Sequence, residues 1–353
     1  MEKEKAISYI ENSFLKSILM IKDVTDISFN GRDFYYVTNQ GGRAKSRMVI
    51  EHQAVKDFLR QIANLSEKQF SYAVPRLDVS IGKYRINATH QSIGKIDDED
   101  VVTFALRVAS STPKITSKSD FFTPEIVSLL KELLNNRLSI VIGGLTSSGK
   151  TELQKYLLRE MNENERVIVI DNVMELDSVR SEKIDLTCWK VDEKNEYASA
   201  SSLIKNALRN NPDWLILAEA RGEEMVDVLN SAMSGAPIIT TIHSLDVKSL
   251  PYRMGRLAQK SQQKMDYQEL LNDIYYHFHF YIYLNKDDSE KKIKRYVSDI
   301  GYVDNEGKFY PLYKRNKDKH TYYQLPKSSL YLFKKEPISE TFKNCFLRGL
   351  TNE

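Results

Sequence analysis

One short segment constrains what this chain can fold into more than any other. Residues 144–151 carry Gly-Leu-Thr-Ser-Ser-Gly-Lys-Thr, which fits the pattern G-x-x-x-x-G-K-[ST]. An apolar, β-branched run at 138–142 precedes it, and a helical pattern at 152–158 follows it. The pattern alone arises by chance in on the order of 1 in 100 chains of this size. Flanked by a strand and then a helix, it predicts a loop that binds nucleotide phosphates.

Each fixed position of this loop has a physical reason. Gly144 and Gly149 allow backbone conformations closed to other residues, so consecutive N–H groups can turn inward and form a nest for an anion. The loop opens a helix, whose unpaired N–H groups and positive dipole end face the same phosphates. Lys150 adds a charge for the β- and γ-phosphates, and the Thr151 hydroxyl is a hard oxygen ligand for Mg²⁺. The predicted nucleotide-binding residues of the segment are Gly144, Thr146, Ser147, Ser148, Gly149, Lys150, Thr151 and Glu152.

Length and composition bound the rest of the chain. At 353 residues it is long for one domain, and the usual range of about 100–200 residues per domain suggests two. The 51 basic and 48 acidic residues nearly balance, which gives no case for wholesale nucleic-acid binding. Cys188 and Cys345 are too far apart for a zinc motif or a disulfide framework and fit the reducing cytoplasm. No apolar run approaches ~18 residues, so a membrane role would be a surface role.

The first 109 residues mix helices and strands without strict alternation. Apolar spacing predicts helices over 6–21 and 55–63. Strands are predicted at 24–31, 34–37, 77–81, 84–88 and 101–108. This mixture predicts a smaller α+β domain over 1–109. Residues 110–121, which contain many turn-forming and polar residues, are the predicted interdomain linker.

From residue 122 onward the patterns of strands and helices alternate. Thr123 and Pro124 fit the N-cap and the first position of a helix. Later apolar runs, at 167–170, 214–218 and 237–242, alternate with helical patterns at 202–209 and 223–233. Runs that are apolar on both faces are typical of a parallel sheet covered by helices, which predicts an α/β domain over 122–315. A hairpin of strands 277–284 and 293–297, with a turn at 286–289, is predicted at the edge of the sheet.

Four ionisable residues fall at or just past the ends of these strands. Asp171 and Glu175 follow the run at 167–170, Glu219 follows the next run and His243 the last. In open α/β sheets, ligands bind at the carboxyl ends of the strands. The convergence of these groups with the phosphate loop predicts one nucleotide site at that edge of the sheet.

The order of these segments resembles that of the secretion ATPases, the superfamily of type II and type IV secretion, conjugation and pilus-assembly motors. The segments that carry the resemblance are 171–176 (Asp-Asn-Val-Met-Glu-Leu), 209–213 (Arg-Asn-Asn-Pro-Asp), 218–223 (Ala-Glu-Ala-Arg-Gly-Glu) and 240–243 (Thr-Thr-Ile-His). Residues 26–31 and 85–107 are similar to the amino-terminal domain of that family, so the resemblance covers nearly the whole chain. It implies a P-loop (RecA-like) NTPase domain preceded by a smaller α+β N-terminal domain, with ATP and Mg²⁺ as cofactors and a hexameric ring as the active form.

The resemblance also implies a role for each site residue. Residues 144–151 correspond to the Walker A loop, Asp171 and Glu175 to the acidic box, Glu219 to the Walker B glutamate and His243 to the histidine of the His box. Two arginines of the amino-terminal domain, which reach toward the nucleotide in this family, match Arg85 and Arg107. The residues predicted to be catalytic are Lys150, Asp171, Glu175, Glu219, His243, Arg85 and Arg107; those predicted to hold the metal are Thr151 and Glu219; and Arg221 is a further predicted nucleotide contact.

Three departures from the family pattern bear on the chemistry. Phosphoryl transfer to water needs charge neutralisation and a carboxylate that orients the attacking water. The family usually has Glu where this chain has Asp171, and one methylene less shortens the reach of that base, which leaves Glu175 or Glu219 to share the work. A commonly seen histidine is replaced in Ser-Gly-Ala at 234–236, and Cys-Trp-Lys at 188–190 stands where a Thr-Arg pair is common.

Several assignments have a plainer alternative. His243 can be a strand-end histidine without a catalytic part, and Arg85 and Arg107 can be ordinary exposed strand arginines. Arg221 can pin its loop through an ion pair instead of contacting nucleotide. The basic, aromatic tail at 316–353 can contact nucleic acid or anionic lipid, although packing of its aromatic residues on the same or a neighbouring subunit is favoured.

The sequence therefore favours a hexameric ATPase motor that drives pilus assembly, protein secretion or conjugative DNA transfer across a bacterial envelope. We expect it in the cytoplasm, peripheral on the inner face of the cell membrane, with an inner-membrane platform or secretion-channel protein as its partner. The alternatives are a nucleotide-gated scaffold that does not hydrolyse ATP and a P-loop transferase that acts on a small acceptor.

Overall fold

The computed structural model describes residues 2–39, 41–109, 114–115, 120–179, 183–261, 265–287, 293–335 and 337–348. The chain divides into two compact units. The first comprises Met1–Thr112 and Asp287–Lys294, and the second comprises Pro113–Lys286 and Arg295–Glu353. Most of the predicted linker, residues 110–113 and 116–119, lies outside the described residues, as do residues 288–289 of the predicted hairpin turn.

The first unit is built on a six-stranded sheet of order β3-β2-β1-β8-β5-β4, in which every neighbouring pair is antiparallel. Side chains alternate along its strands: in β4, Leu77, Val79 and Ile81 are buried and the residues between them are exposed. The buried side chains form one core with those of the three helices. The elements are α1 (Glu2–Glu11), α2 (Lys16–Leu19), β1 (Val24–Phe29), β2 (Phe34–Thr38), β3 (Gly42–Lys45), α3 (His52–Leu65), β4 (Arg76–Ile81), β5 (Tyr84–Thr89), β6 (Lys95–Ile96), β7 (Glu99–Asp100) and β8 (Thr103–Val108).

The prediction of a single helix over 6–21 is wrong, because α1 ends at Glu11 and α2 begins at Lys16. The side chain of Ser13 explains the break. Its Oγ donates to the carbonyl of Ile10 at 2.7 Å and accepts from the backbone N–H of Leu15 at 3.2 Å. Serine side chains that bond to nearby backbone groups in this way compete with the helical hydrogen bonds.

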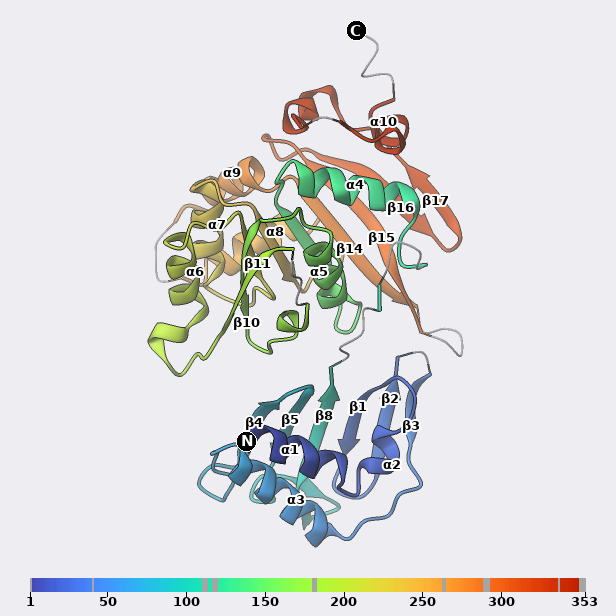
Figure 1. Ribbon diagram of the computed structural model, residues 1–353, viewed down its shortest axis with the longest axis vertical. Helices are drawn as coiled ribbons and strands as arrows, with labels where there is room; N and C mark the ends of the chain where they lie inside the picture. The colour runs from blue at the N-terminus through green and yellow to red at the C-terminus, as the bar shows by residue number, and fades with distance from the viewer. Residues whose placement is uncertain are drawn as a thin grey trace. The chain divides into compact units, whose positions relative to one another are not determined.

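The second unit contains a nine-stranded sheet of order β11-β10-β12-β13-β9-β14-β15-β16-β17 (Figure 1). The pairs from β11 through β14 are parallel, whereas β15–β16 and β16–β17 are antiparallel. The strands are β9 (Ile140–Gly144), β10 (Arg166–Asp171), β11 (Asp185–Lys190), β12 (Trp214–Leu217), β13 (Ile238–Ile242), β14 (Phe280–Asp287), β15 (Lys294–Val303), β16 (Phe309–Asn316) and β17 (Lys319–Tyr322).

Helices cover both faces of this sheet and divide the core in two. Along β9, Ile140 and Ile142 join the core formed with α4, α5 and α10, whereas Val141 joins the core formed with α6 to α9. The helical elements are α4 (Pro124–Asn135), α5 (Lys150–Arg159), η1 (Leu176–Ser178), η2 (Glu196–Ala198), α6 (Ala200–Leu208), α7 (Met225–Met233), α8 (Leu250–Ala258), α9 (Tyr267–His277), η3 (Lys327–Leu332) and α10 (Glu340–Phe346). As expected, Thr123 caps α4, with its Oγ1 accepting from the N–H of Ile126 at 3.4 Å.

The sheet extends further than the sequence indicated. The predicted edge hairpin, β14 and β15, lies inside the sheet because β16 and β17 continue it. Residues of the predicted tail fold onto the same unit: Phe342 and Phe346 of α10 are fully buried in the core beside α4. None of the described helices is both long and apolar enough to cross a membrane.

Candidate active site

The loop between β9 and α5 has the backbone shape that its sequence predicts. Gly144 (φ +152°), Ser147 (φ +61°) and Gly149 (φ +102°) all have positive φ angles. A Cβ atom at Gly144 would lie 2.5 Å from Ser148 Oγ and 2.8 Å from the carbonyl oxygen of Leu284. No side chain fits there, so the glycine allows β9, β14 and the loop to pack closely. Thr146 and Ser147 are exposed at the tip of the loop.

Lys150 begins α5 and its side chain lies under the loop. The residue is only 8% exposed, and its Nζ donates to the carbonyls of Gly144 and Leu145, each at 3.0 Å. Ser148 is buried beside it, and its Oγ has no hydrogen-bond partner in the described part of the chain. A buried ammonium held by neutral carbonyls, next to an unused hydroxyl, is a donor set suited to an anion such as a phosphate.

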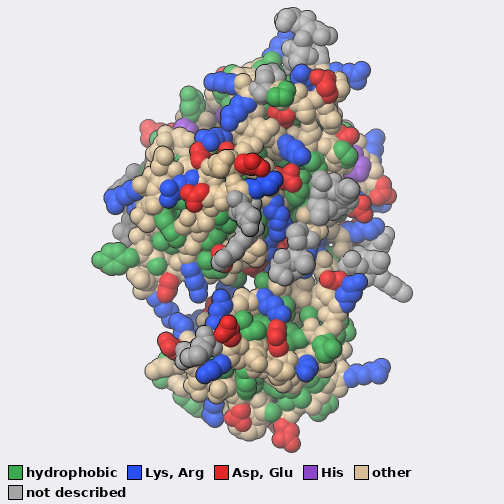
Figure 2. Space-filling view, viewed as in Figure 1, with side chains coloured by type: hydrophobic (Ala, Val, Ile, Leu, Met, Phe, Trp, Pro, Cys, Tyr) green, Lys and Arg blue, Asp and Glu red, His purple; other side chains and the backbone are tan. Residues whose placement is uncertain are grey.

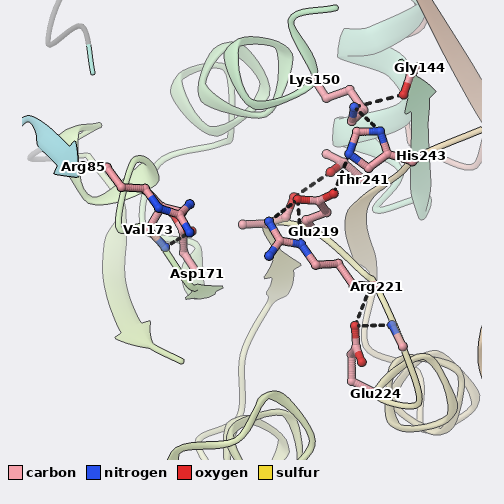
Figure 3. A network of polar contacts seen from close by, with 12 residues as sticks. Arg85, Gly144, Lys150, Asp171, Val173, Glu219, Arg221, Glu224, Thr241 and His243 are labelled. Atoms are coloured by element: carbon pink, nitrogen blue, oxygen red, sulfur yellow. Dashed lines mark hydrogen bonds and ion pairs between the residues drawn. The ribbon is translucent and has the colours of Figure 1, made fainter. Parts of the chain in front are cut away.

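Glu219, Arg221 and His243 continue from Lys150 as a row of polar contacts (Figure 3). His243 Nδ1 lies 3.4 Å from Lys150 Nζ, and its Nε2 lies 2.8 Å from Glu219 Oε1. Because an ammonium can only donate, Nδ1 faces it as an acceptor and Nε2 carries the proton given to Glu219. Glu219 Oε2 accepts from Arg221 Nε at 3.0 Å and from Nη2 at 2.6 Å. Both oxygens of the carboxylate are therefore engaged by side chains.

Hydrogen bonds within and beside the loop after β12 support the positions of Glu219 and Arg221. Glu224, just before α7, accepts from the backbone N–H groups of Arg221 and Gly222. Thr241 of β13 donates its hydroxyl to the carbonyl of Ala218 at 2.7 Å. The side chain of Arg221 pairs with Glu219, as the ion-pair alternative for this residue expects.

Asp171 occupies a different kind of environment at the end of β10. It is 3% exposed, and its two oxygens accept from the backbone N–H groups of Val173 at 2.8 Å and Leu176 at 3.2 Å. These bonds close a turn in which Met174 has φ +60°. Glu175 follows in the same turn and is only partly exposed, with its carbonyl accepting from Ser178 Oγ at 2.7 Å. The geometry thus gives Asp171 a turn-forming role and brings Glu175 to the surface of that turn.

The remaining predicted residues of this unit are placed as follows. Thr151 is the second residue of α5 and is partly exposed. Glu152 forms an ion pair with the buried Lys155 at 3.0 Å. Among the described residues, no cluster of three or more His, Cys, Asp or Glu side chains is arranged to hold a metal ion. A magnesium ion here would therefore need phosphate oxygens as well as protein ligands, which is how this ion usually binds beside nucleotides.

Arg85 and Arg107 lie in the first unit and are direct cross-strand partners on β5 and β8. Like charges in that position repel one another. Asp26 pairs with Arg107 from β1, and Asp78 lies 3.7 Å from Arg85, so acidic residues accompany both. The sheet thus presents two adjacent guanidinium groups on one face. Their contact with a nucleotide stays a prediction.

Sequence reasoning missed three residues around the loop. Gln154 of α5 is fully buried and donates to the carbonyl of Leu217 at 3.1 Å, which ties α5 to β12. Tyr283 of β14 donates its hydroxyl to the carbonyl of Ser244, next to His243, at 3.1 Å. Arg295 of β15 donates Nε to the carbonyl of Ser147 at 2.7 Å. Gln154 could have been found as a polar residue one helical turn after Lys150. No sequence pattern indicates Tyr283 or Arg295.

The fold and the loop define an α/β protein with a glycine-rich turn at the carboxyl edge of a parallel sheet, where ligands bind in folds of this kind. A family model described as "Type II/IV secretion system protein" matches residues 94–272, about half of the chain. The chain therefore belongs to this secretion ATPase superfamily, as its sequence resemblance indicated.

Individual relatives and a solved structure are similar to this chain. The chain is 28% identical to an uncharacterised protein of Bacillus anthracis over 78% of its own length and 63% of that relative. It is 22% identical to a candidate conjugal transfer protein of Mycobacterium tuberculosis over 69% of this chain and 72% of the relative. The X-ray structure of the Legionella pneumophila ATPase DotB has the same fold, with a TM-score of 0.63 and 18% identity, over 86% of this chain and 79% of DotB.

Proposed function

We propose that the second unit is a P-loop (RecA-like) ATPase domain and that the chain hydrolyses ATP to drive secretion, conjugative DNA transfer or pilus assembly. The observation that carries this proposal is the row of contacts from Lys150 through His243 to Glu219 at the carboxyl edge of the sheet. These contacts join the phosphate loop to Glu219, the acid that the sequence resemblance assigns to ATP hydrolysis. The family membership and the named activity of DotB support the reading.

The residues present fit a nucleotide and Mg²⁺. Lys150, the unused Ser148 hydroxyl and the loop amides would bind the phosphates, while Thr151 and Glu219 would hold the ion. Bound Mg²⁺ neutralises charge on the phosphate oxygens. A carboxylate oxygen can accept two hydrogen bonds, and Glu219 Oε1 accepts from His243, so this oxygen can also contact an ion or a water. The pair with Arg221 can also open toward solvent, because the Arg221 side chain is 53% exposed.

We assign the orientation of the attacking water to Glu175 and Glu219. The carboxylate of Asp171 is committed to two backbone amides, so its part in our proposal is to shape the turn that presents Glu175. Arg85 and Arg107 would add positive charge from the first unit, on the same or a neighbouring subunit, as in the family pattern.

The wider assembly is part of the same proposal, and family membership supports it. We propose a homo-hexamer that is peripheral on the cytoplasmic face of the inner membrane and bound to a platform or secretion-channel protein. Direct nucleic-acid contact has little support: basic and acidic side chains are interspersed on the face shown in Figure 2, and the net charge is only +3.

One observation favours a nucleotide-gated scaffold as a second candidate. Both oxygens of Glu219 and both of Asp171 are occupied by protein groups, which would suit a site that binds ATP without hydrolysing it. Phosphate release distinguishes the two functions, and a phosphorylated acceptor in place of free phosphate would indicate a transferase.

The test is to purify the full chain and measure its mass with and without ATP·Mg²⁺ while following phosphate release. We expect phosphate release and a ring of six chains, with nucleotide binding and turnover lost in Lys150→Ala. Lys131→Ala is the matched control, because that exposed lysine of α4 pairs with Glu160 at the far end of α5 from the loop. Turnover retained in both Lys150→Ala and Glu219→Gln would overturn the proposal.

A further inference from the structure

The first residues of β15 contact the phosphate loop, although 148 positions separate Arg295 from Ser147 in the chain. Arg295 Nε donates to the carbonyl of Ser147 at 2.7 Å, a short hydrogen bond from a charged group to the exposed tip of the loop. Ser147 needs such support, because its φ of +61° lies in the left-handed region that non-glycine residues avoid.

Fixing this carbonyl also fixes the next amide. In a planar trans peptide the C=O of one residue and the N–H of the next point in opposite directions. With its carbonyl held by Arg295, Ser147 directs the N–H of Ser148 away from β15, and this N–H donates to the carbonyl of Leu145 at 3.3 Å. Lys150 Nζ donates to the same carbonyl. Arg295 and Lys150 thus brace the same short turn of the loop, Arg295 at the carbonyl of Ser147 and Lys150 at the carbonyl of Leu145.

The same strand supports the other end of the loop. Val297 of β15 donates its N–H to the carbonyl of Phe121 at 2.9 Å, which fixes the Phe121 ring next to Gly149. A Cβ at Gly149 would lie 3.2 Å from that ring and 3.8 Å from Arg295 Cδ. Two of the three positive-φ residues of the loop, Ser147 and Gly149, therefore contact β15 or a residue hydrogen-bonded to it.

We propose that Arg295 is a positioning residue that preorganises the phosphate loop for the diphosphate part of a nucleotide. This inference rests on the proposed function, because it assumes that the loop binds nucleotide phosphates. It acts through the 147–148 peptide, so ATP and ADP depend on it equally. A direct contact between the guanidinium and the γ-phosphate would instead favour ATP.

Two substitutions separate the hydrogen bond from the charge. In Arg295→Gln, Nε2 is bonded to Cδ just as Nε is in arginine, so a neutral donor remains at the same place in the side chain. In Arg295→Met, a methyl group stands there instead. Measured by equilibrium titration with fluorescent ADP and ATP analogues, Arg295→Met is expected to weaken both about tenfold and Arg295→Gln about threefold. The unfolding temperature without nucleotide should stay unchanged in both variants.

Arg256→Met is the control, because Arg256 is an exposed arginine in the last turn of α8. Its nucleotide affinity should equal that of the unsubstituted chain. Unchanged nucleotide affinity in Arg295→Met would overturn the inference. Equal losses of ATP affinity in Arg295→Met and Arg295→Gln, with ADP affinity unchanged, would overturn it as well. If the unsubstituted chain binds no nucleotide, the proposed function itself fails, whereas binding that is lost in Lys150→Ala but kept in Arg295→Met removes only the role of Arg295.

Discussion

Two acids end neighbouring strands of the same sheet, yet their surroundings differ. Asp171 at the end of β10 is 3% exposed, and its oxygens accept from the backbone amides of Val173 and Leu176. Glu219, just after β12, has a side chain that is 20% exposed and is held by the side chains of Arg221 and His243. Backbone amides move only when the chain refolds locally, whereas side chains can change rotamer.

This difference indicates which acid can change partners during a reaction cycle. Release of Asp171 would leave buried amides unpaired and open its turn, at a cost to the folded state. Glu219 can exchange Arg221 for another cation or for water by a change of rotamer, because the Arg221 side chain is 53% exposed. We therefore expect Asp171 to matter chiefly for stability and Glu219 chiefly for turnover.

The largest expected effect is on turnover in Glu219→Gln. Glutamine keeps the volume and can still contact His243, but it is uncharged and cannot serve as a base. We expect the kcat for ATP hydrolysis to fall about 100- to 1000-fold, with nucleotide affinity and unfolding temperature nearly unchanged. Steady-state phosphate release and a thermal melt on one preparation measure this. Glu223→Gln, an exposed glutamate on the same loop, is the control and should retain full activity.

The second substitution, Asp171→Ala, should act mainly on folding. It removes the acceptor of two amides at a buried position, which we expect to destabilise the second unit by about 2–3 kcal/mol and lower its unfolding temperature by roughly 5–10 °C. Asp185→Ala, at an exposed position of β11, is the control and should change the free energy of unfolding by less than about 0.5 kcal/mol. If Asp171→Ala abolished turnover at low temperature without lowering the unfolding temperature, the contrast between the two acids would be wrong.

The sequence predicted those parts of the site that depend on local order in the chain. A strand, a glycine-rich loop and a helix follow one another directly, and parallel strands place their ends at one edge, so Lys150, Glu219 and His243 could be expected together. Their hydrogen-bond partners could not be predicted, because side chains that lie close together at one edge of a sheet can pair in several ways. Nothing in the sequence indicated that Asp171 would be used by its own turn.

Elements were missed for two different reasons. β11 is an edge strand with partly exposed residues and gives no clear alternation, so hydrophobic periodicity does not detect it. In α8 the helical spacing is present in the sequence, with Leu250, Met254 and Leu257 all buried, but no helix was predicted between residues 243 and 277. The contact of Arg295 with Ser147 joins distant segments through a backbone carbonyl, which leaves no signature in the side chains of either.

The smallest expected effect tests how His243 is held. Tyr283 of β14 donates its hydroxyl to the carbonyl of Ser244, and burial raises the pKa of this phenol, so it remains a donor across the neutral range. In Tyr283→Phe the turn after β13 loses this hydrogen bond while the ring stays packed. If His243 contributes to turnover by bridging Lys150 and Glu219, kcat should fall roughly three- to tenfold with the KM for ATP unchanged. Tyr276→Phe, at a 62% exposed tyrosine of α9, should have no effect. A rise in KM with unchanged kcat would instead show that Tyr283 acts on nucleotide binding. The effect of Glu219 on turnover would then not depend on how His243 is held.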